Sequence, residues 1–390
     1  MDKALIWLLI VCVVILVLLY ILNIFDSPWT PKYSKNPEDL LLRQGFTPLS
    51  NITDVKFFSK GIDAMDSIIE DIRNEKKYIN VSFYSMRMSD ESRTFINALI
   101  DAVKRKVKVR FVYDFVGRSD GIQRLKEAGG EIVKFYPFSN ILNTFSLRNH
   151  DKYIMLGNKI LYMSSFVISK ESLQNWVESS LRITGDFSDS ALDNRLMNSL
   201  LKEAYSMRRL YIPFWCSKKI AYGIYADLYL NTILNAKKSI YIINPYFVPP
   251  DEITNALIEM SHKITIKALV LSKSDHPIIR EDAIHLIRYI LAKSGKGITF
   301  YEYPHKHVHS KIMLADDDVV IFGSGNLDYR SLFQMHEVGM YIRDPELSAT
   351  IKKHFDELAK DSKVENKPYG LYDKAIVNIF GKNDILRNVL

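Results

Sequence analysis

Apolar positions along the chain recur with two spacings, which predict helices alternating with strands. Apolar residues three or four positions apart predict helices, and short runs rich in β-branched and aromatic residues predict strands. In the first half these patterns predict helices over residues 64–74, 94–104 and 122–128, and strands over residues 78–84, 107–113 and 131–135. In the second half they predict helices over residues 225–235, 252–260 and 281–294, and strands over residues 239–246, 265–271 and 298–303.

The two halves also match in sequence, which predicts a duplicated unit. The run Asn97-Ala98-Leu99-Ile100 recurs as Asn255-Ala256-Leu257-Ile258 at an offset of 158 (255 − 97), and Lys76-Lys77 recurs as Lys237-Lys238 at 161 (237 − 76). Chance matches would not keep so nearly constant an offset. Because strands alternate with helices, we expect an α/β fold of two pseudo-symmetric repeats with mainly parallel sheets flanked by helices.

We expect the repeats to occupy residues 51–195 and 196–365 and to form one composite catalytic unit. Residues 26–50, with several prolines and mixed charge, predict a linker. In the tail, residues 366–390, apolar and basic positions interleave. That pattern fits either a helix docked on the domain or an amphipathic helix lying on a membrane surface.

The N-terminal segment is apolar throughout residues 4–22, where no charged side chain occurs. As a helix this segment would be about 29 Å long, close to the roughly 30 Å hydrocarbon core of a bilayer. A signal peptide would have a shorter apolar centre and a small-residue cleavage site, which this segment lacks. The pattern predicts a single-pass anchor within residues 1–25, in the cell membrane. Lys32, Lys35 and Arg43 follow the segment and only Lys3 precedes it, which favours a cytoplasmic catalytic domain.

Composition narrows the class of protein without choosing a substrate. Hydrophobic residues make up 47% and charged residues 25%, which is a globular composition. The net charge of +7 suits an anionic partner, either lipid or nucleic acid. Cys12 lies in the apolar segment and is remote from Cys216, and no Cys/His cluster has zinc-ligand spacing. We therefore expect no disulfide framework, no metal and no cofactor.

One segment of the second half carries a specific motif. His309, Lys311 and Asp316 are followed by Gly323-Ser324-Gly325-Asn326. This spacing resembles the phospholipase D signature HxK(x)4D(x)6GSxN at every position. The run from Gly323 to Phe333 and the earlier Pro245-Tyr246-Phe247-Val248-Pro249 resemble bacterial cardiolipin synthases, and the resemblance extends to about residue 365.

The residue types suit chemistry at an anionic phosphodiester. Lys311 supplies positive charge, Asn326 supplies amide donors, and a glycine such as Gly323 lets backbone approach a ligand closely. A histidine can attack phosphorus, and a second histidine can protonate the leaving alcohol and then deprotonate the incoming one. Histidine suits both roles because its ordinary pKa is near neutral.

The first half keeps part of the same motif. His150 and Lys152 are present, but Gly157 replaces the aspartate, Ser164-Ser165 replaces Gly-Ser, and Val167 replaces the asparagine. Two acids recur at equal spacing, because Glu178 follows His150 by 28 residues (178 − 150) and Glu337 follows His309 by 28 (337 − 309). A carboxylate on the far ring nitrogen fixes the tautomer of a histidine. We expect each histidine to be oriented by the glutamate of its own half.

These residues predict one composite site between the halves. The expected catalytic residues are His150, His309, Lys152, Lys311, Glu178 and Glu337. The expected phosphate-binding residues are Lys152, Lys311, Asn326, Ser324 and Ser165, with Asp316 and Gly323 as motif support. The resemblance implies that His150 is the nucleophile and His309 the acid/base, although the altered first motif leaves the reverse assignment open. His305 and His307 are expected to be solvated or at the rim of the site.

The resemblance implies a cardiolipin synthase-like phosphatidyltransferase, which would join two phosphatidylglycerol molecules through a phosphohistidine and release glycerol. Three alternatives stay open: a phospholipase D hydrolase, a membrane-tethered nuclease of the same superfamily, and a weak or inactive homologue. The expected partners are phospholipid and membrane, with no obligate protein partner. Nucleic acid is less favoured, because strand binding calls for a denser basic and aromatic surface than this sequence shows.

Overall fold

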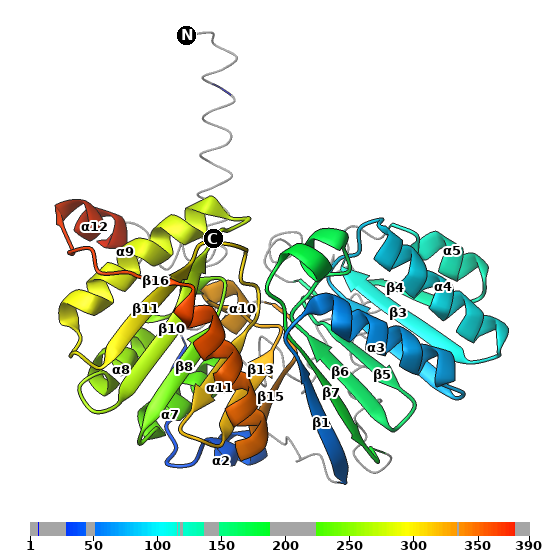
Figure 1. Cartoon of the computed structure of the whole chain (residues 1–390), viewed down its shortest axis with the longest axis horizontal. Helices are drawn as coiled ribbons and strands as arrows, with labels where there is room; N and C mark the ends of the chain where they lie inside the picture. The colour runs from blue at the N-terminus through cyan, green and yellow to red at the C-terminus, as the bar shows by residue number, and fades with distance from the viewer. Residues whose placement is uncertain are drawn as a thin grey trace.

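Two α/β units lie side by side in the structure, a computed structural model (Figure 1). The structure describes Trp7 and residues 29–43, 51–114, 116–117, 120–135, 148–187, 224–333 and 335–378. Each unit is built on a seven-stranded sheet.

The first unit begins with an edge strand and continues with alternating helices and strands. Its elements are β1 (Ile52–Phe58), α3 (Gly61–Asn74), β2 (Tyr78–Phe83), α4 (Asp90–Lys104), β3 (Lys108–Asp114), α5 (Ile122–Glu127), β4 (Glu131–Phe135), β5 (Tyr153–Leu156), β6 (Ile160–Ser164), the short π-helix η1 (Glu171–Asn175) and β7 (Ser180–Gly185). The strand order is β1-β7-β6-β5-β2-β3-β4.

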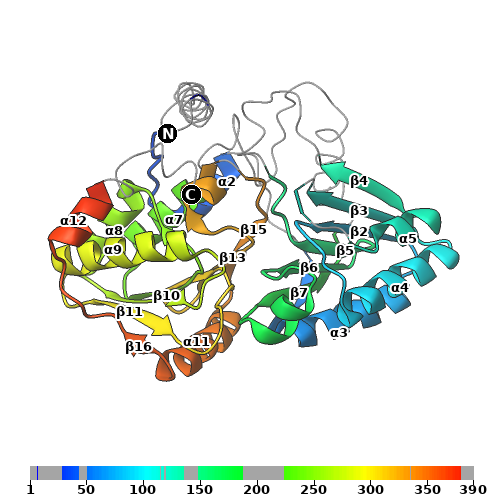
Figure 2. The same ribbon diagram turned by 90° about the horizontal axis from the view of Figure 1, so that it is seen from above.

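The second unit repeats this arrangement and adds a long helix near its end. Its elements are α7 (Ile224–Asn235), β8 (Ser239–Ile243), β9 (Phe247–Val248), α8 (Asp251–Met260), β10 (Thr265–Ser272), α9 (Pro277–Lys293), β11 (Ile298–Tyr303), β12 (Ile312–Ala315), β13 (Val319–Gly323), β14 (Leu327–Asp328), α10 (Tyr329–Phe333), β15 (Gly339–Arg343), α11 (Pro345–Lys360), β16 (Lys363–Val364) and α12 (Leu371–Ile376). The strand order is β15-β13-β12-β8-β10-β11-β16. Seen from above, α3, α4 and α5 lie on the outer side of the first unit, whereas α8 and α9 lie on one side of the second unit and α11 on the other (Figure 2).

The twelve helices and strands predicted from the apolar spacing are all present, but the prediction of mainly parallel sheets is wrong. Within the two seven-stranded sheets as the structure describes them, only β2-β3-β4 and β8-β10-β11 run parallel. The neighbouring pairs β5-β6 and β12-β13 are antiparallel, because residues 157–159 and 316–318 connect them directly. A connection this short permits a hairpin and excludes the crossover that parallel strands need. Both sheets are therefore mixed.

Local sequence accounts for where the helices start. Ser89 and Ser92 cap α4 reciprocally, each hydroxyl accepting from the backbone N–H of the other residue. Asp344 caps α11 by accepting from the backbone of Glu346 and Leu347, and Pro345 occupies its first position. Caps of this kind satisfy backbone donors that a helix start leaves unpaired, and each typically contributes about 1 kcal/mol.

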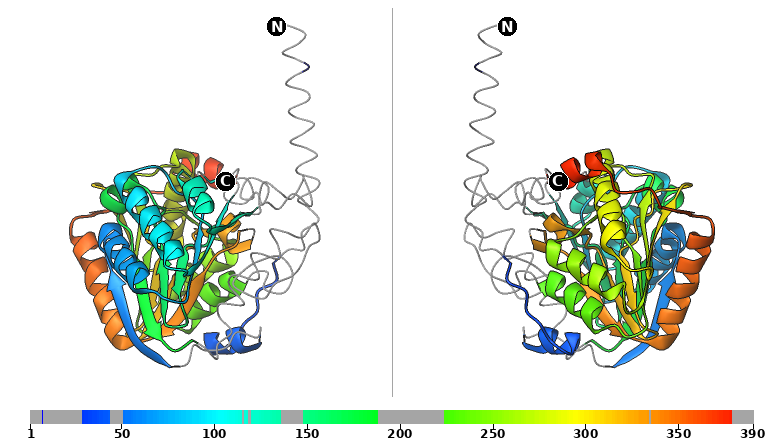
Figure 3. Two further views of the ribbon diagram at one scale, coloured as in Figure 1. Left: turned by 90° about the vertical axis from the view of Figure 1, so that its right-hand side faces the viewer. Right: turned by 90° about the vertical axis from the view of Figure 1, so that its left-hand side faces the viewer.

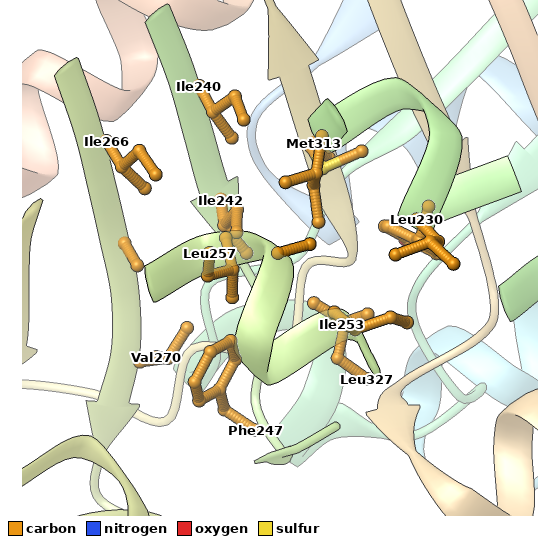
Figure 4. Packing of buried hydrophobic residues seen from close by; sticks show 14 of the residues in the cluster. Leu230, Ile240, Ile242, Phe247, Ile253, Leu257, Ile266, Val270, Met313 and Leu327 are labelled. Atoms are coloured by element: carbon orange, nitrogen blue, oxygen red, sulfur yellow. The ribbon is translucent and has the colours of Figure 1, made fainter. Parts of the chain in front are cut away.

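Each unit has its own apolar core, and a third cluster joins them. In the second unit, α8 packs Ile253 and Leu257 onto β8 and β10, close to Phe247 (Figure 4). The joining cluster combines Tyr153 and Leu181 of the first unit with Ile312 and Phe355 of the second. Helix α11 also contacts β1 of the first unit at this junction (Figure 1). The shared core holds the two units in one fixed arrangement.

The fold class needs a correction at the N-terminus. Within the described residues, no helix has the length and apolar character required to cross a membrane. The segment predicted as a transmembrane helix lies in residues 1–25, which are outside the described part of the chain except for Trp7. The transmembrane helix is therefore removed from the fold class, which becomes two mixed α/β repeats. The predicted cytoplasmic orientation depended on that helix, and the structure does not test it.

The segments flanking the repeats pack onto the second unit. Within the predicted linker, the indole of Trp29 donates to Asp227 of α7 (3.0 Å) and the backbone of Ser34 donates to Asn231 (2.6 Å). The following helix α2 (Pro37–Arg43) also contacts α7. At the other end, α12 lies against α9 (Figure 3), where Asp373 accepts from His285 (2.6 Å). The described part of the tail, residues 366–378, contains the docked helix α12 (Leu371–Ile376); the rest of the tail lies outside the described residues.

Candidate active site

Two short backbone bridges between the units position the predicted histidines and glutamates. Val177 of the first unit bridges Val308 of the second, and Asn149 bridges His336. The backbone N–H of His309 donates to Val177 (2.9 Å), and that of His150 donates to His336 (2.9 Å). Each bridge is followed on one strand by a histidine and on the other by a glutamate. The bridges therefore place each histidine beside the glutamate of the opposite unit.

The side chains pair accordingly. Nδ1 of His150 lies 2.9 Å from Oε1 of Glu337, and Nδ1 of His309 lies 2.9 Å from Oε1 of Glu178. The prediction that each histidine pairs with the glutamate of its own half is wrong. Spacing along the chain found both acids but could not assign them, because the two possible pairings are equivalent in a duplicated sequence.

Serines hold the two glutamates in place. Ser324 donates to Glu337 (2.6 Å), and Ser172 donates to Glu178 (2.5 Å). Ser165 also donates to Glu178 and accepts from the backbone of Ser179 (2.9 Å). The predicted phosphate-binding role of Ser165 and Ser324 is not supported by this geometry, since both hydroxyls are buried against carboxylates. Ser172 lies outside the motif, and no sequence signal pointed to it.

The two lysines are buried beside the histidines. Nζ of Lys152 donates to the carbonyl of His150 (2.9 Å), and Nζ of Lys311 donates to the carbonyl of His309 (2.5 Å). The negative charges of Glu178 and Glu337 also act on each ammonium and raise the pKa of both lysines, against the lowering effect of burial. The site thus brings together all six side chains predicted to be catalytic, three from each unit; five of them are buried, and His150 is partly exposed at 13%.

Comparison with known proteins assigns the chain to a family. The family model described as "Cardiolipin synthase, PLD-like domain" matches residues 68–199 and 229–359. The chain belongs to this family. Cardiolipin synthase 1 of Staphylococcus aureus (strain COL) is 27% identical over 375 residues, which cover 88% of this chain and 75% of that protein. Cardiolipin synthase 1 of Staphylococcus epidermidis (strain ATCC 35984) is 26% identical over 377 residues, covering 89% and 76%.

Solved structures share the fold at low sequence identity. Phosphatidylserine synthase of Haemophilus influenzae Rd KW20 has a TM-score of 0.67 at 13% identity, covering 90% of this chain and 97% of that one. Polyphosphate kinase of Porphyromonas gingivalis has a TM-score of 0.55 at 13% identity, covering 84% of this chain and 55% of that one. These likenesses concern the fold alone.

The aspartate of the PLD-like motif lies at the far end of the sheet from the histidines. Asp316 sits in the β12-β13 turn with a φ of 55°, and its carboxylate accepts from the backbone of Lys237 (2.9 Å) and Lys238 (2.7 Å). Gly157 occupies the same turn of the first unit with a φ of 51°. In the first unit Glu75 takes the place of Asp316 as the acceptor.

Glu75 accepts from the backbone of Lys76 (2.8 Å) and Lys77 (2.6 Å), the counterparts of Lys237 and Lys238. A Cβ at Gly157 would come within 3.1 Å of the Glu75 carboxylate. The glycine therefore belongs to an alternative cap of the same strand. Its presence does not mark a decayed active site.

The remaining motif residues separate into structural and binding positions. A Cβ at Gly323 would lie 2.4 Å from the carbonyl of Val338, so the glycine serves packing within the sheet. Asn326 is buried, and among the described residues its side-chain oxygen has no hydrogen-bond partner. It precedes β14, which pairs with β9 and thereby joins the Pro245–Pro249 motif to the GSxN motif. Val167 stands at the equivalent position of the first unit and offers no polar group.

Burial sets the protonation of the site. It lowers the pKa of His150 to about 4, against the raising effect of Glu337, and it lowers the pKa of His309 well below the ordinary value. Both imidazoles are therefore neutral near pH 7. In the tautomer that donates from Nδ1 to a glutamate, Nε2 carries the lone pair. Each histidine is thus prepared to act as a nucleophile or a base.

The site contains no assembled metal centre among the residues that the structure describes, since no three His, Cys, Asp or Glu side chains are placed to hold an ion. The positive charges come from the lysines. Burial lowers the pKa of Lys152 to about 8, and burial with the neighbouring Lys152 charge lowers that of Lys311 to about 7.

The carboxylates of Glu75 and Asp316 should affect stability and leave the chemistry unchanged. Replacing Glu75 or Asp316 with alanine should lower the free energy of unfolding by about 1 kcal/mol each, because two backbone donors lose a charged acceptor. Urea unfolding would measure this loss. Asp317→Ala, which removes an exposed neighbouring carboxylate, is the matched control. Activity per folded molecule should change less than about twofold; a large loss of activity at unchanged stability would place these acids in the chemistry.

The lysine pKa values predict an alkaline limit to activity. A lysine is charged only below its pKa, so the free enzyme loses positive charge as the pH rises through about 7, the pKa of Lys311. We expect kcat/KM to fall through that pH. In the pH profile of kcat, this alkaline fall should occur at a higher pH, because bound phosphate favours the charged form of the lysine. In Lys311→Arg the alkaline fall in kcat/KM should move towards pH about 8, the pKa of Lys152. If the fall stays at the same pH, it belongs to a group other than Lys311.

Proposed function

We propose that this protein is a phosphatidyltransferase that joins two phosphatidylglycerol molecules into cardiolipin and releases glycerol. The observation that carries the proposal is the pair of histidines, one from each unit, whose Nδ1 atoms are held by Glu337 and Glu178 of the opposite units. Family membership and the relatives named cardiolipin synthase supply the substrate class. A phospholipid substrate places the reaction at a membrane surface.

The first step transfers the phosphatidyl group to the enzyme. Nε2 of His150 attacks the phosphorus of the donor lipid, and the bond from phosphorus to the glycerol oxygen breaks. The bound anionic phosphate stabilises the protonated form of His309, which is neutral in the free enzyme. In the complex His309 gives its Nε2 proton to that oxygen, so glycerol leaves as a neutral alcohol. Glu337 stabilises the positive ring of the phosphohistidine, while Glu178 holds His309 in the orientation needed for proton transfer.

The second step reverses these roles for a second lipid. His309 takes the proton from the hydroxyl of the acceptor phosphatidylglycerol, and the oxygen attacks the phosphorus. The bond from phosphorus to Nε2 of His150 breaks, which restores the free histidine and completes cardiolipin. Lys152, Lys311 and the amide of Asn326 surround the phosphoryl oxygens and stabilise the charge that develops on them. The buried setting strengthens these interactions.

The tail offers a surface for contact with the bilayer. Leu371 and Tyr372 of α12 are 87% and 71% exposed, although the helix itself is fixed to α9 through buried Asp373. Exposed apolar side chains beside Lys367 and Lys374 suit the interfacial region of an anionic membrane. We therefore assign residues 366–378 to the membrane-facing side of the enzyme.

The alternatives differ in what attacks the intermediate or in what is bound. Attack by water in place of an alcohol would give a phospholipase D hydrolase, and a nucleic-acid phosphodiester would make the protein a nuclease. An inactive homologue would have little reason to keep both histidines, both lysines and both glutamates in mutual contact. The complete set favours a working enzyme.

The products formed from phosphatidylglycerol test the proposal. Purified protein mixed with phosphatidylglycerol vesicles should form cardiolipin and free glycerol in equal amounts, measured by mass spectrometry and enzymatic glycerol assay. His150→Ala and His309→Ala should each lower the rate by at least roughly 10³-fold, since each removes a reacting group. Phosphatidic acid as the main product would indicate a hydrolase. Cleavage of single-stranded DNA without lipid turnover would indicate a nuclease.

The crossed pairing predicts which variants behave alike. A donor lipid with a nitrophenolate leaving group needs no acid, so labelled phosphatidyl-enzyme should accumulate when the base is impaired. We expect Glu178→Gln to resemble His309→Ala and Glu337→Gln to resemble His150→Ala. Each glutamine variant should be slowed by roughly 10- to 100-fold. Acid-quenched enzyme would be assayed for bound label; the opposite grouping would show that each glutamate serves the histidine of its own unit.

A further inference from the structure

A second histidine lies beside His309 and has no part in the mechanism above. His307 precedes His309 by two residues in an extended segment, so both side chains point to the same side, and their ring centroids are 5.5 Å apart. The sequence-based prediction placed His307 in solvent or at the rim, but it is only 5% exposed. The matched neighbour His305 is exposed, as predicted.

His307 is held by aromatic rings and a serine. The ring of Trp176 packs edge-to-face with both histidines, with centroid distances of 4.7 Å to His307 and 5.2 Å to His309. The ring centroid of Tyr246 lies 6.3 Å from that of His307. Oγ of Ser272 lies 3.5 Å from Nδ1. These contacts fix the ring so that its other nitrogen, Nε2, is directed away from Ser272.

Nε2 of His307 is buried and makes no hydrogen bond within the described residues, although Oδ1 of Asp275 lies 3.4 Å away. Two polar atoms at this separation can both contact one hydroxyl oxygen placed about 2.8 Å from each. The Asp275 side chain is 40% exposed and also accepts from the hydroxyl of Tyr246. The cluster therefore has a closed side, formed by the rings around Nε2, and an exposed edge at the Asp275 carboxylate, which is the side from which an alcohol would approach.

The equivalent position of the first unit has a different charge. Arg148 precedes His150 by two residues, at the same offset of 159 that relates the two histidines (307 − 148 and 309 − 150). Arg148 is a permanent cation near Asp114. Burial lowers the pKa of His307, so this flank carries a neutral ring beside a carboxylate. Such a flank suits a neutral group with hydroxyls, whereas the arginine flank suits an anion.

We propose that His307 and Asp275 bind the hydroxyl adjacent to the reacting oxygen of a glycerol headgroup, and so select a vicinal diol. This inference rests on the proposed function. The leaving and the entering alcohol are both glycerol groups, and both exchange a proton with His309. One diol-binding subsite beside His309 therefore serves both steps. Holding the diol there also favours an alcohol over water as the group that attacks the phosphohistidine.

Two small acceptors that differ by one hydroxyl test the inference. With phosphatidylglycerol vesicles as donor, propane-1,2-diol and propan-1-ol compete for the intermediate, and the two phosphatidyl products are separated by mass spectrometry. The wild-type enzyme should prefer the diol by at least roughly tenfold, because a site built for a hydroxyl discriminates against its absence. In His307→Phe and Asp275→Asn this preference should fall to about twofold or less. The total rate of transfer should fall as well, because the same subsite binds the leaving glycerol of the donor, so the ratio of the two products is the decisive readout.

His305→Phe is the matched control, because it makes the same replacement at the exposed neighbour and should keep the diol preference. Asp275→Asn preserves size and provides a second variant should His307→Phe fold poorly, which circular dichroism and thermal unfolding would show. Cardiolipin formation by the wild type with an unchanged preference in both variants would overturn this inference alone. Absence of cardiolipin in the wild type would overturn the proposed function as well.

Discussion

The site depends on two backbone bridges that cross between the units. Val177 with Val308, and Asn149 with His336, are single-pair bridges, yet each places a histidine of one unit against a glutamate of the other. Neither unit alone holds an oriented histidine, because the carboxylate that fixes each tautomer belongs to its partner. The apolar cluster shared by the two sheets keeps this junction rigid, which is the condition for holding reacting groups in a fixed geometry. Catalytic competence is therefore a property of the assembled pair of repeats.

Burial gives the site its reactivity and also makes it fragile. Lys152, Lys311, Glu178 and Glu337 are all buried, and removal of one charge from such a group leaves its partners uncompensated. The same burial keeps the imidazoles neutral and lowers the lysine pKa values towards neutrality. An anionic phosphate entering the site relieves these costs, because it favours the charged lysines. The free enzyme thus carries a charge arrangement that its substrate completes.

The sequence predicted three helices and three strands in each unit, together with the six central side chains, because these depend on local periodicity and on a spaced motif. It did not predict the antiparallel strands β5–β7 and β12, β13 and β15, or the long helix α11. It could not assign Glu178 and Glu337 to their histidines, since a duplicated chain offers two pairings with identical spacing. It also missed the mixed sheets. The strands β5 and β12 are only four residues long, which is too short to show a period. Their hairpin turns contain Gly157 and Asp316, whose spacing belongs to the motif and so gives no separate signal of a turn. The cap at Glu75 was hidden for a related reason: the acceptor moved to another segment while the backbone donors stayed.

Duplication explains why the two halves of the site are alike where chemistry is shared and differ where recognition begins. Histidine, lysine and glutamate recur in both units because both histidines must be oriented, neutral and close to positive charge. At other positions of the site the two units need not carry the same residue. Asn326 in the second unit corresponds to Val167 in the first, and His307 corresponds to Arg148. During the reaction the phosphorus has different groups on its two sides, with the leaving alcohol on one and the attacking histidine nitrogen on the other. A site with two unlike flanks can distinguish these sides, whereas a perfectly symmetric site would bind the substrate equally well in either direction and would gain no orientation from binding.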